Sequence, residues 1–321
     1  MSTVNRGTTP EVLISEVGPR DGLQSISRTM PTEAKLAWID ALAQAGLKEI
    51  EVGSFVPARL MPQMADVAEV VRHSTARHPG ITVMALVPNV RGAEAALAAG
   101  ARKLTVPVSA SEAHSMANVR KTREQMLEEV RQMAALCRCQ PTHVPLEVGV
   151  STAFGCTLQG AVPEDDVIRL ADALAHAGVD EVGLSDTTGM ANPAQVRRLF
   201  TRLRRALGER AGAAHLHNTR GLGLANCLAA YEAGVRTFDA SQGGLGGCPY
   251  APGASGNVVT EDLVFMFEAM GVRTGVDLEP LLVARAVLAA GLPGESLYGM
   301  TPEAGLPLGF TYADGRRPSP A

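Results

Sequence analysis

Two histidines separated by one residue, His215 and His217, are the clearest candidates for chemistry in this chain. They end a short apolar run that is typical of a strand. Side chains on a strand alternate with a period of two, so both imidazoles would face the same side and one metal ion could bind both. A pair of hydrogen-bonded structural histidines would have the same spacing, so the motif alone leaves the two alternatives open.

A carboxylate that could complete such a site is Asp21, in the segment EVGPRDGLQ directly after the first predicted strand. Together with an amide oxygen, Asp21 and the two histidines would form a mixed oxygen and nitrogen ligand set, which suits Mg2+ or Mn2+. The sequence has no thiolate cluster of the kind that binds structural zinc. Asp-Gly is also a common turn dipeptide, so a turn is the structural alternative for Asp21.

Two charged residues near Asp21 could act on a reacting group. Arg20 carries a permanent charge that could stabilise an oxygen that becomes negative during a reaction. Glu51 shares one face of the strand segment KEIEVGSF with Glu49 and Gly53, and a buried carboxylate needs a partner. The simplest partner is Arg20, so a salt bridge between Arg20 and Glu51 is the structural alternative to a role in the reaction.

The glycine-rich segment 242–257 is long for a loop between a strand and a helix, which favours an active-site lid. It contains Cys248 within GGLGGCPYAPGASGN, where glycines permit close approach of the backbone and the thiol could donate a proton to a substrate. A flexible connection is the alternative, and the spacing matches neither a P-loop nor a dinucleotide-binding motif. Buried packing is expected for the other four cysteines, Cys137, Cys139, Cys156 and Cys227.

Alternating strands and helices would position these residues. A helix that ends in Ala-Gly precedes a short apolar strand four times, and glycine closes a helix in the left-handed conformation. These glycines are Gly46, Gly100, Gly178 and Gly234. Strands are predicted at 12–17, 50–54, 81–87, 103–108, 144–151, 181–185, 213–217 and 237–240, with helices such as 32–45 between them.

This alternation fits both a closed barrel and an open doubly wound sheet. Candidate residues, however, follow strands one, two, six (Asp186) and seven, and side chains from both ends of the strand order converge only if the sheet closes. We therefore predict an α/β protein, a single-domain (β/α)8 TIM barrel over about residues 10–272. A short C-terminal extension would follow over about 273–321, with a helix at 277–292 and a loose tail.

Composition and charge exclude several classes of protein. Hydrophobic residues make up 46% and charged residues 19% of the chain, which is typical of a globular core. A net charge of −4 without a block of Lys or Arg argues against nucleic-acid and membrane-surface partners. No apolar stretch approaches the ~20 residues that cross a bilayer. The N-terminal segment lacks an apolar signal core and no Cys-x-x-Cys pair occurs, so a cytoplasmic protein with reduced thiols is expected.

Four segments closely resemble the 3-hydroxy-3-methylglutaryl-CoA (HMG-CoA) lyases, members of the DRE-TIM metallolyase superfamily: EVGPRDGLQ, EVGSFV, HLHNTRGLGLAN and GGLGGCPYAPGASGNVVTEDL. The similarity runs from about residue 16 to residue 275. It implies a divalent-metal-dependent lyase on a (β/α)8 barrel whose substrate is a CoA thioester. The reaction would be a retro-aldol-type cleavage of HMG-CoA to acetyl-CoA and acetoacetate.

The resemblance also implies a ligand set and a base. A divalent cation, Mg2+ or Mn2+, would be bound by Asp21, His215, His217 and Asn257. Either Asp21 or His215 would remove the proton from the substrate hydroxyl. The sequence does not choose between them.

Four further roles follow from the same resemblance. Arg20 would stabilise the thioester enolate, Glu51 would organise the site, and Cys248 would act from its loop near proton transfer. Asp186, in LSDTTG after strand six, matches an acidic position that is associated with the site in this family. Without the resemblance, Asp186 is a turn residue or a helix N-cap.

Two departures from the family pattern concern the acyl group. Asn218-Thr219-Arg220 follows the second histidine, where these lyases usually have Asp-Thr-Tyr, and FGCTLQG follows strand five in place of a Gly-Cys-Pro pattern. Citramalyl-CoA, which would give acetyl-CoA and pyruvate, is therefore an alternative substrate. It is shorter by one methylene, a difference worth only ~1–3 kcal/mol in a pocket. Arg220 could reposition its carboxylate.

Two other classes are weighed against the lyase. Condensing synthases of the same superfamily join acetyl-CoA to a 2-oxo acid but commonly read Arg-Asp-Gly-Glu-Gln, where this chain has Arg-Asp-Gly-Leu-Gln. A non-catalytic binding protein would be favoured by the loss of a ligand position, and none is lost. A homodimer is expected from the apolar terminal helix, and leucine or branched-acid degradation is the expected pathway.

Overall fold

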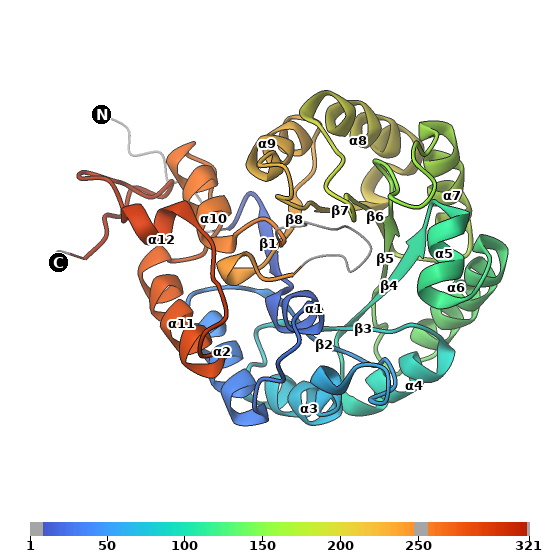
Figure 1. Cartoon of the computed structure of the whole chain (residues 1–321), viewed down its shortest axis with the longest axis horizontal. Helices are drawn as coiled ribbons and strands as arrows, with labels where there is room; N and C mark the ends of the chain where they lie inside the picture. The colour runs from blue at the N-terminus through green and yellow to red at the C-terminus, as the bar shows by residue number, and fades with distance from the viewer. Residues whose placement is uncertain (1–8, 247–255, 320–321) are drawn as a thin grey trace.

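The computed structural model describes residues 9–246 and 256–319. Its eight parallel strands pair in chain order, and β1 pairs with both β2 and β8, so the sheet is a closed barrel. The strands are β1 (Leu13–Glu16), β2 (Glu49–Ser54), β3 (Thr82–Leu86), β4 (Lys103–Ser109), β5 (Leu146–Ser151), β6 (Glu181–Ser185), β7 (Ala211–His215) and β8 (Thr237–Ala240). Figure 1 shows them as a central ring with the helices outside, which confirms the predicted (β/α)8 barrel.

Helices of the described residues connect the strands on the outside of the barrel. They are α1 (Leu23–Ser25), α2 (Thr32–Gln44), α3 (Val67–Arg77), α4 (Val90–Ala99), α5 (Glu112–Val119), α6 (Arg123–Arg138), α7 (Glu164–His176), α8 (Pro193–Leu207), α9 (Gly223–Glu232) and α10 (Thr260–Ala269). Short turns of other helix types are η1 (Gly18–Gly22), η2 (Pro62–Met64), η3 (Gly208–Arg210) and η4 (Gln242–Gly244). The chain ends with α11 (Leu278–Gly291) and α12 (Met300–Ala304).

The four Ala-Gly junctions have the backbone conformation that the sequence predicts. Their φ angles are 101°, 92°, 98° and 97° at Gly46, Gly100, Gly178 and Gly234. At Gly46 a side chain is also excluded by space, because a Cβ atom would lie 2.5 Å from the carbonyl oxygen of Gly275. Left-handed glycine therefore turns the chain from a helix into the next buried strand.

The seventh strand differs from its prediction by two residues. It was expected at 213–217, but β7 runs from Ala211 to His215, and His217 lies beyond it in an isolated bridge with Asn257. Its first residues are small. A Cβ atom added to Gly212 would lie 3.3 Å from the backbone carbon of Val182 on β6, so the two strands approach closely here. Small residues that allow close strand approach carry little apolar signal, so the sequence pattern placed the strand too late.

Side chains along a strand point alternately to the helices and to the barrel interior, and on β2 this alternation separates apolar from polar residues. On β2, Ile50 and Val52 are buried between the sheet and the helices, whereas Glu49 and Glu51 make their contacts inside the barrel. Near the N-terminal ends of the strands, the Lys103 ammonium lies 2.8–3.3 Å from three carboxylates. We call Lys103, Glu49, Glu147 and Glu181 the basal charge cluster.

The C-terminal extension packs against the barrel. Asp277 caps α11 by accepting from the backbone of Glu279, and α11 packs on α2. The tail was predicted to be loose, but the backbone nitrogen of Ala313 donates to Glu268 at 2.8 Å and the Tyr312 hydroxyl donates to Asp277 at 2.9 Å. Buried aromatic rings that the sequence pattern does not connect to a core thus hold this segment.

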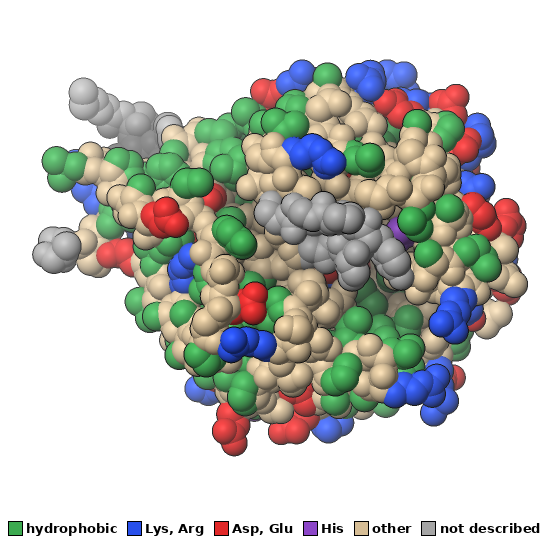
Figure 2. All heavy atoms as spheres, in the orientation of Figure 1, with side chains coloured by type: hydrophobic (Ala, Val, Ile, Leu, Met, Phe, Trp, Pro, Cys, Tyr) green, Lys and Arg blue, Asp and Glu red, His purple; other side chains and the backbone are tan. Residues whose placement is uncertain are grey.

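The surface shows no concentration of one charge on the face in view. Lys and Arg side chains are dispersed among Asp and Glu side chains around the rim of this face in Figure 2. Within residues 9–246 and 256–319, no helix is both long enough and apolar enough to span a membrane.

Candidate functional site

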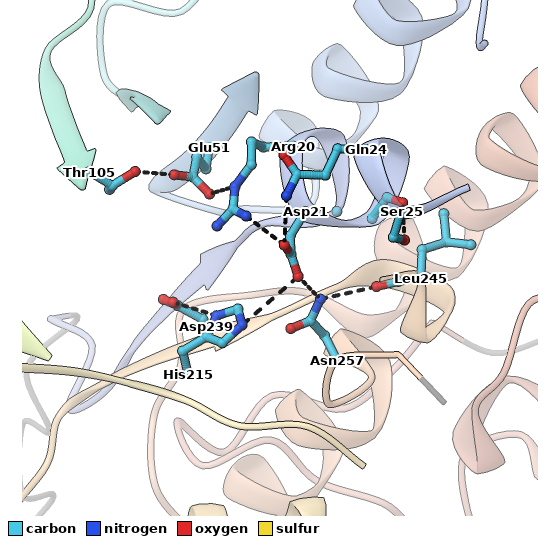
Figure 3. A network of polar contacts seen from close by, with 12 residues as sticks. Arg20, Asp21, Gln24, Ser25, Glu51, Thr105, His215, Asp239, Leu245 and Asn257 are labelled. Atoms are coloured by element: carbon cyan, nitrogen blue, oxygen red, sulfur yellow. Dashed lines mark hydrogen bonds and ion pairs between the residues drawn. The ribbon is translucent and has the colours of Figure 1, made fainter. Parts of the chain in front are cut away.

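The first part of the site is the turn η1, which follows β1 and carries Arg20 and Asp21. Pro19 is the second residue of the turn, and the backbone nitrogen of Asp21 donates to the carbonyl oxygen of Val17 at 2.7 Å. The buried Glu16 accepts from the nitrogen of Gly18 at 2.8 Å. This turn, anchored at both ends, points Arg20 and Asp21 toward the centre of the barrel mouth (Figure 3).

Arg20 lies between two carboxylates. Its Nε donates to Glu51 Oε2 and its Nη1 donates to Asp21 Oδ1 at 2.5 Å. Glu51 also accepts from the Thr105 hydroxyl, as Figure 3 shows. Burial raises the pKa of Glu51, and Arg20 and Thr105 offset only part of that shift. The predicted salt bridge between Arg20 and Glu51 is confirmed, and it fixes the orientation of the guanidinium.

The two histidines face one another as the sequence predicts. Their Nε2 atoms are 3.2 Å apart, and each lies 3.9 Å from Asp21 Oδ2. One ligand atom from each of the three side chains lies within 4.8 Å of the other two. Burial by itself would raise the pKa of Asp21, but Arg20 and both histidines lower it well below its usual range. Asp21 is therefore ionised and able to bind a cation.

Asn257, which is 236 residues after Asp21 in the sequence, contacts the Asp21 carboxylate. Its Nδ2 donates to Asp21 Oδ2 at 2.7 Å and to the carbonyl oxygen of Leu245 at 3.1 Å. Its Oδ1 is buried and has no hydrogen-bond partner among the described residues. We call Asp21, His215, His217 and Asn257 the apical cluster.

The apical cluster fits a hard divalent cation. It offers a carboxylate oxygen, two imidazole nitrogens and the unpaired Asn257 Oδ1, a donor set that suits Mg2+ or Mn2+. A buried amide oxygen without a partner is costly, and a bound cation would satisfy it. The chemistry of the residues is thus consistent with the predicted metal.

Asp239 on β8 belongs to the site although the sequence did not point to it. Its Oδ2 lies 3.0 Å from His215 Nδ1 (Figure 3). Burial lowers the pKa of His215, but Asp239 and Asp21 raise it by more, so the net shift is upward. The sequence did contain a signal for Asp239, namely a carboxylate within the short strand segment TFDA. Asp239 shares a strand face with Thr237, and a carboxylate buried in a strand needs a partner, so a role in the site could have been predicted.

Asp186 holds a loop. It accepts from the backbone nitrogens of Met190 at 2.8 Å and Ala191 at 3.1 Å, in the connection between β6 and α8. Burial raises its pKa, and the contact with Ala191 and the charge of His217 oppose that shift. Asp186 is not among the three residues whose ligand atoms lie within 4.8 Å of one another. The turn that the sequence alone indicates is its observed role.

Arg220, in the connection between β7 and α9, contacts the same loop between β6 and α8. Its Nη1 donates to the carbonyl oxygens of Thr188 at 3.2 Å and Gly189 at 2.6 Å. These contacts give no support to the expectation that Arg220 reaches a substrate carboxylate. They fit a residue that shapes the mouth of the barrel.

The cysteines fall into three groups. Cys248 lies outside the described residues. Cys137, Cys156 and Cys227 are buried, as predicted, and burial raises the pKa of the Cys137 thiol to about 11. The prediction is wrong for Cys139, which is exposed because it caps the C-terminal end of α6, beyond the packed face of that helix.

Sequence comparisons match most of the chain. The HMGL-like family model matches residues 11–288. A hydroxymethylglutaryl-CoA lyase of Bacillus subtilis is 44% identical over 274 residues, which are 85% of this chain and 91% of that protein. The mitochondrial hydroxymethylglutaryl-CoA lyase of Macaca fascicularis is 41% identical over 285 residues, 88% of this chain and 87% of that protein.

Solved structures give the same result. The HMG-CoA lyase of Bacillus subtilis is similar with a TM-score of 0.87 and 41% identity, covering 92% of this chain and 98% of that one. An HMG-CoA lyase of Acinetobacter baumannii, in complex with coenzyme A and 3-methylmalate, has a TM-score of 0.87 and 39% identity and covers 100% of both chains. The carboxyl transferase domain of Rhizobium etli pyruvate carboxylase, at 19% identity and a TM-score of 0.70, shares the fold alone.

Proposed function

We propose that this chain, which belongs to the HMGL-like family, is a lyase that cleaves a carbon–carbon bond in HMG-CoA with the help of a divalent cation. The products are acetyl-CoA and acetoacetate. The observation that carries the proposal is the apical cluster, where three ligand atoms converge within 4.8 Å beside the Arg20 guanidinium.

The cation would be held by Asp21, His215, His217 and Asn257. When bound, it supplies Lewis-acid binding of the substrate's tertiary hydroxyl and carboxylate oxygens. The depressed pKa of Asp21 supports this assignment, because the carboxylate keeps its negative charge at neutral pH. Mg2+ and Mn2+ are the cations proposed from the oxygen and nitrogen donors.

Proton removal from the substrate hydroxyl is assigned to Asp21 or His215, which lie at the same point of the barrel mouth. As the proton leaves, the bond between the hydroxyl-bearing carbon and the thioester's α-carbon breaks, and its electron pair forms the enolate of acetyl-CoA. Protonation of that enolate completes the reaction, and we assign this step to the neighbourhood of Cys248.

Arg20 is proposed to stabilise the enolate oxygen. Its Nε and Nη1 are held by Glu51 and Asp21, while Nη2 makes no hydrogen bond within the described part of the chain (Figure 3). A charged donor whose orientation is fixed before the reaction stabilises developing negative charge without reorganisation. Glu51 thus organises the site through Arg20. Asp186 is proposed to shape the rim of the site through its loop.

Citramalyl-CoA is the less favoured substrate. The relatives that match this chain over most of its length are named for HMG-CoA. The relative from Acinetobacter baumannii was solved with coenzyme A and a hydroxy-dicarboxylate, 3-methylmalate, which supports a CoA thioester of a hydroxy-dicarboxylic acid as the substrate class. A difference of one methylene is worth only ~1–3 kcal/mol, so both thioesters belong in the test.

A product assay tests the proposal. The purified protein is incubated with HMG-CoA, citramalyl-CoA and a saturated acyl-CoA that lacks the hydroxyl group, and the products are identified by mass spectrometry. We expect acetyl-CoA and acetoacetate from HMG-CoA and a lower rate with citramalyl-CoA. Pyruvate formed faster than acetoacetate would reverse the substrate assignment, and condensation of acetyl-CoA with a 2-oxo acid would identify a synthase.

The oligomeric state and the cellular setting are a separate proposal. We propose a homodimer in the cytoplasm that acts in leucine degradation, which follows from the family and the apolar terminal helix. Sedimentation analysis of the purified protein tests the dimer, and a monomer at micromolar concentration would contradict it.

A further inference from the structure

We propose that Asp239 is a positioning residue that fixes the tautomer of His215. The Asp239 carboxylate accepts the Nδ1 proton of His215, so that the lone pair on Nε2 faces the other ligand atoms. The inference rests on the proposed function, because it gives a reason why His215 is preset as a metal ligand.

The geometry separates the two nitrogens of the His215 ring. Nδ1 lies 3.0 Å from Asp239 Oδ2, whereas Nε2 lies 3.9 Å from Asp21 Oδ2 (Figure 3). The same Nε2 lies 3.2 Å from His217 Nε2. An ionised carboxylate only accepts hydrogen bonds, so the neutral ring must carry its proton on Nδ1. The ring nitrogen that faces Asp21 is then the one with the free lone pair.

The pair is built into the strands of the barrel. His215 and Asp239 are direct neighbours in the register of β7 and β8, and Asp239 is also the neighbour of Ser15 on β1. Their side chains are 14% and 17% exposed, so solvent competes little for the hydrogen bond. Side chains on strands of a closed barrel hold their geometry more precisely than side chains on loops.

No other contact explains Asp239. The three carboxylates that contact the Lys103 ammonium are Glu49, Glu147 and Glu181, so Asp239 is not needed to neutralise the basal charge cluster. Within the described residues, His215 is the only side chain that makes a hydrogen bond or ion pair with Asp239. A buried carboxylate with a single imidazole partner fits an orienting role.

His217 provides an internal contrast. Within residues 9–246 and 256–319, its buried Nδ1 has no hydrogen-bond partner, so no carboxylate of these residues holds that nitrogen. The two histidines of the motif therefore differ in what holds them. Asp239 therefore acts on the tautomer of His215 directly, and on that of His217 only through the contact between the two Nε2 atoms.

The first test is the tautomer itself. Histidine nitrogen NMR on metal-free, 15N-labelled protein is recorded with rising pH until the imidazolium signature of His215 has disappeared, and its signals are assigned by their loss in His215→Asn. We expect the Nδ1–H tautomer in the wild type and loss of that preference in Asp239→Asn, whose amide can donate to Nδ1. An Nε2–H tautomer in the wild type overturns the inference, and this outcome does not depend on whether the variant folds.

The second test is metal affinity. Mn2+ is titrated into metal-free wild type, Asp239→Asn and Asp40→Asn, with bound ion measured by electron paramagnetic resonance. Asp40 is a matched control, because it makes a carboxylate–imidazole contact of 2.5 Å with His78 outside the site. We expect the Mn2+ Kd to rise roughly 10- to 100-fold in Asp239→Asn and to stay unchanged in Asp40→Asn.

The outcomes separate the two proposals. If the wild type binds Mn2+ and Asp239→Asn binds it equally well, the positioning role of Asp239 is wrong and the metal-dependent function stands. If the wild type does not bind Mn2+ or Mg2+, the metal-dependent function is wrong, and the NMR experiment still decides the tautomer. Circular dichroism and thermal unfolding of each variant show whether its fold is retained.

Discussion

The two ends of the barrel interior carry the same imbalance of charge and resolve it differently. At the basal end, Glu49, Glu147 and Glu181 surround the single ammonium of Lys103. At the apical end, three carboxylates lie around the single guanidinium of Arg20, which contacts Glu51 and Asp21 and is attracted by Asp239. Both groups are held by buried strands and turns, so both need compensation for lost hydration.

The basal end compensates with a proton. Burial raises the pKa of Glu147 to about 8 although the Lys103 ammonium lies 2.8 Å away, so this carboxyl stays protonated at neutral pH. The apical end has ligand atoms instead: two imidazole Nε2 atoms that face each other and an unpaired Asn257 Oδ1. The basal charge cluster is thus neutralised within itself, whereas the apical cluster offers ligand atoms that a cation could bind.

The largest expected effect comes from breaking the apical end. Arg20→Gln and His215→Ala should each lower kcat for HMG-CoA cleavage by about 10³-fold or more, because a charged donor or a metal ligand is lost. Acetoacetate formation measures the rate. Far-ultraviolet circular dichroism should remain that of the wild type, and a near-wild-type rate in either variant would remove that residue from the mechanism.

Removing the cation of the basal charge cluster should lower stability and leave the apical cluster's metal affinity unchanged. Lys103→Met leaves the buried Glu49 and Glu147 and the partly exposed Glu181 without their cation and should lower the free energy of unfolding by ~3–5 kcal/mol. The Mn2+ affinity of the folded variant should stay unchanged. Urea unfolding and Mn2+ titration measure the two quantities, and a loss of metal affinity without a loss of stability would contradict the division of roles.

A smaller effect is expected at Glu16, which connects the turn η1 to Gln242 and Thr260. Its carboxylate accepts from Gly18 N at 2.8 Å, Gln242 N at 3.0 Å and the Thr260 hydroxyl at 2.7 Å. Glu16→Ala leaves the two backbone donors without their acceptor and should cost ~1–3 kcal/mol of unfolding free energy. Urea unfolding of the variant measures this cost, and a midpoint equal to that of the wild type would show that Glu16 is dispensable.

A pH dependence of stability is also expected from Glu147. Its pKa is raised from 4.5 to about 8 in the folded chain, so the folded state binds a proton that the unfolded state releases. Stability from this group is present at low pH and falls, by about 1 kcal/mol per pH unit, as pH rises between these two values. Glu147→Gln should flatten this part of the pH profile.

Urea unfolding of wild type and Glu147→Gln at about pH 6 and about pH 9 gives the measurement. The raised pKa of Glu16, about 8, is common to both proteins and cancels in the comparison. Equal slopes in the two proteins would contradict the assignment of the proton to Glu147.

The sequence predicts those parts of the molecule that local physics determines. The left-handed glycines and apolar strands predicted the alternation of strands and helices, because both signals lie within a few residues of one another. The closed barrel was predicted from the candidate residues that follow strands at both ends of the strand order, and the sheet is closed. His215, His217 and Asp21 were found from residue type and strand period, and the structure brings them together. Asn257 was named from resemblance only, since an asparagine in a glycine-rich loop carries no signal of its own.

The parts that were missed depend on contacts between distant segments. Asp239 lies 24 residues from His215, and only the register of β7 with β8 makes them neighbours. The packed tail depends on Tyr312 reaching Asp277, 35 residues earlier. Arg220 looked like a substrate contact because its carbonyl partners, Thr188 and Gly189, belong to another loop.

The most direct test of metal-dependent cleavage uses chelator-treated, metal-free protein. Acetoacetate formation from HMG-CoA is measured while Mg2+ or Mn2+ is added stepwise, with bound metal determined in parallel. We predict no cleavage without metal and a rate that rises in proportion to occupancy of one site per chain, with neither binding nor turnover in His217→Ala. Full-rate cleavage by metal-free protein, or saturation of the site without acetoacetate formation, would contradict the proposed function.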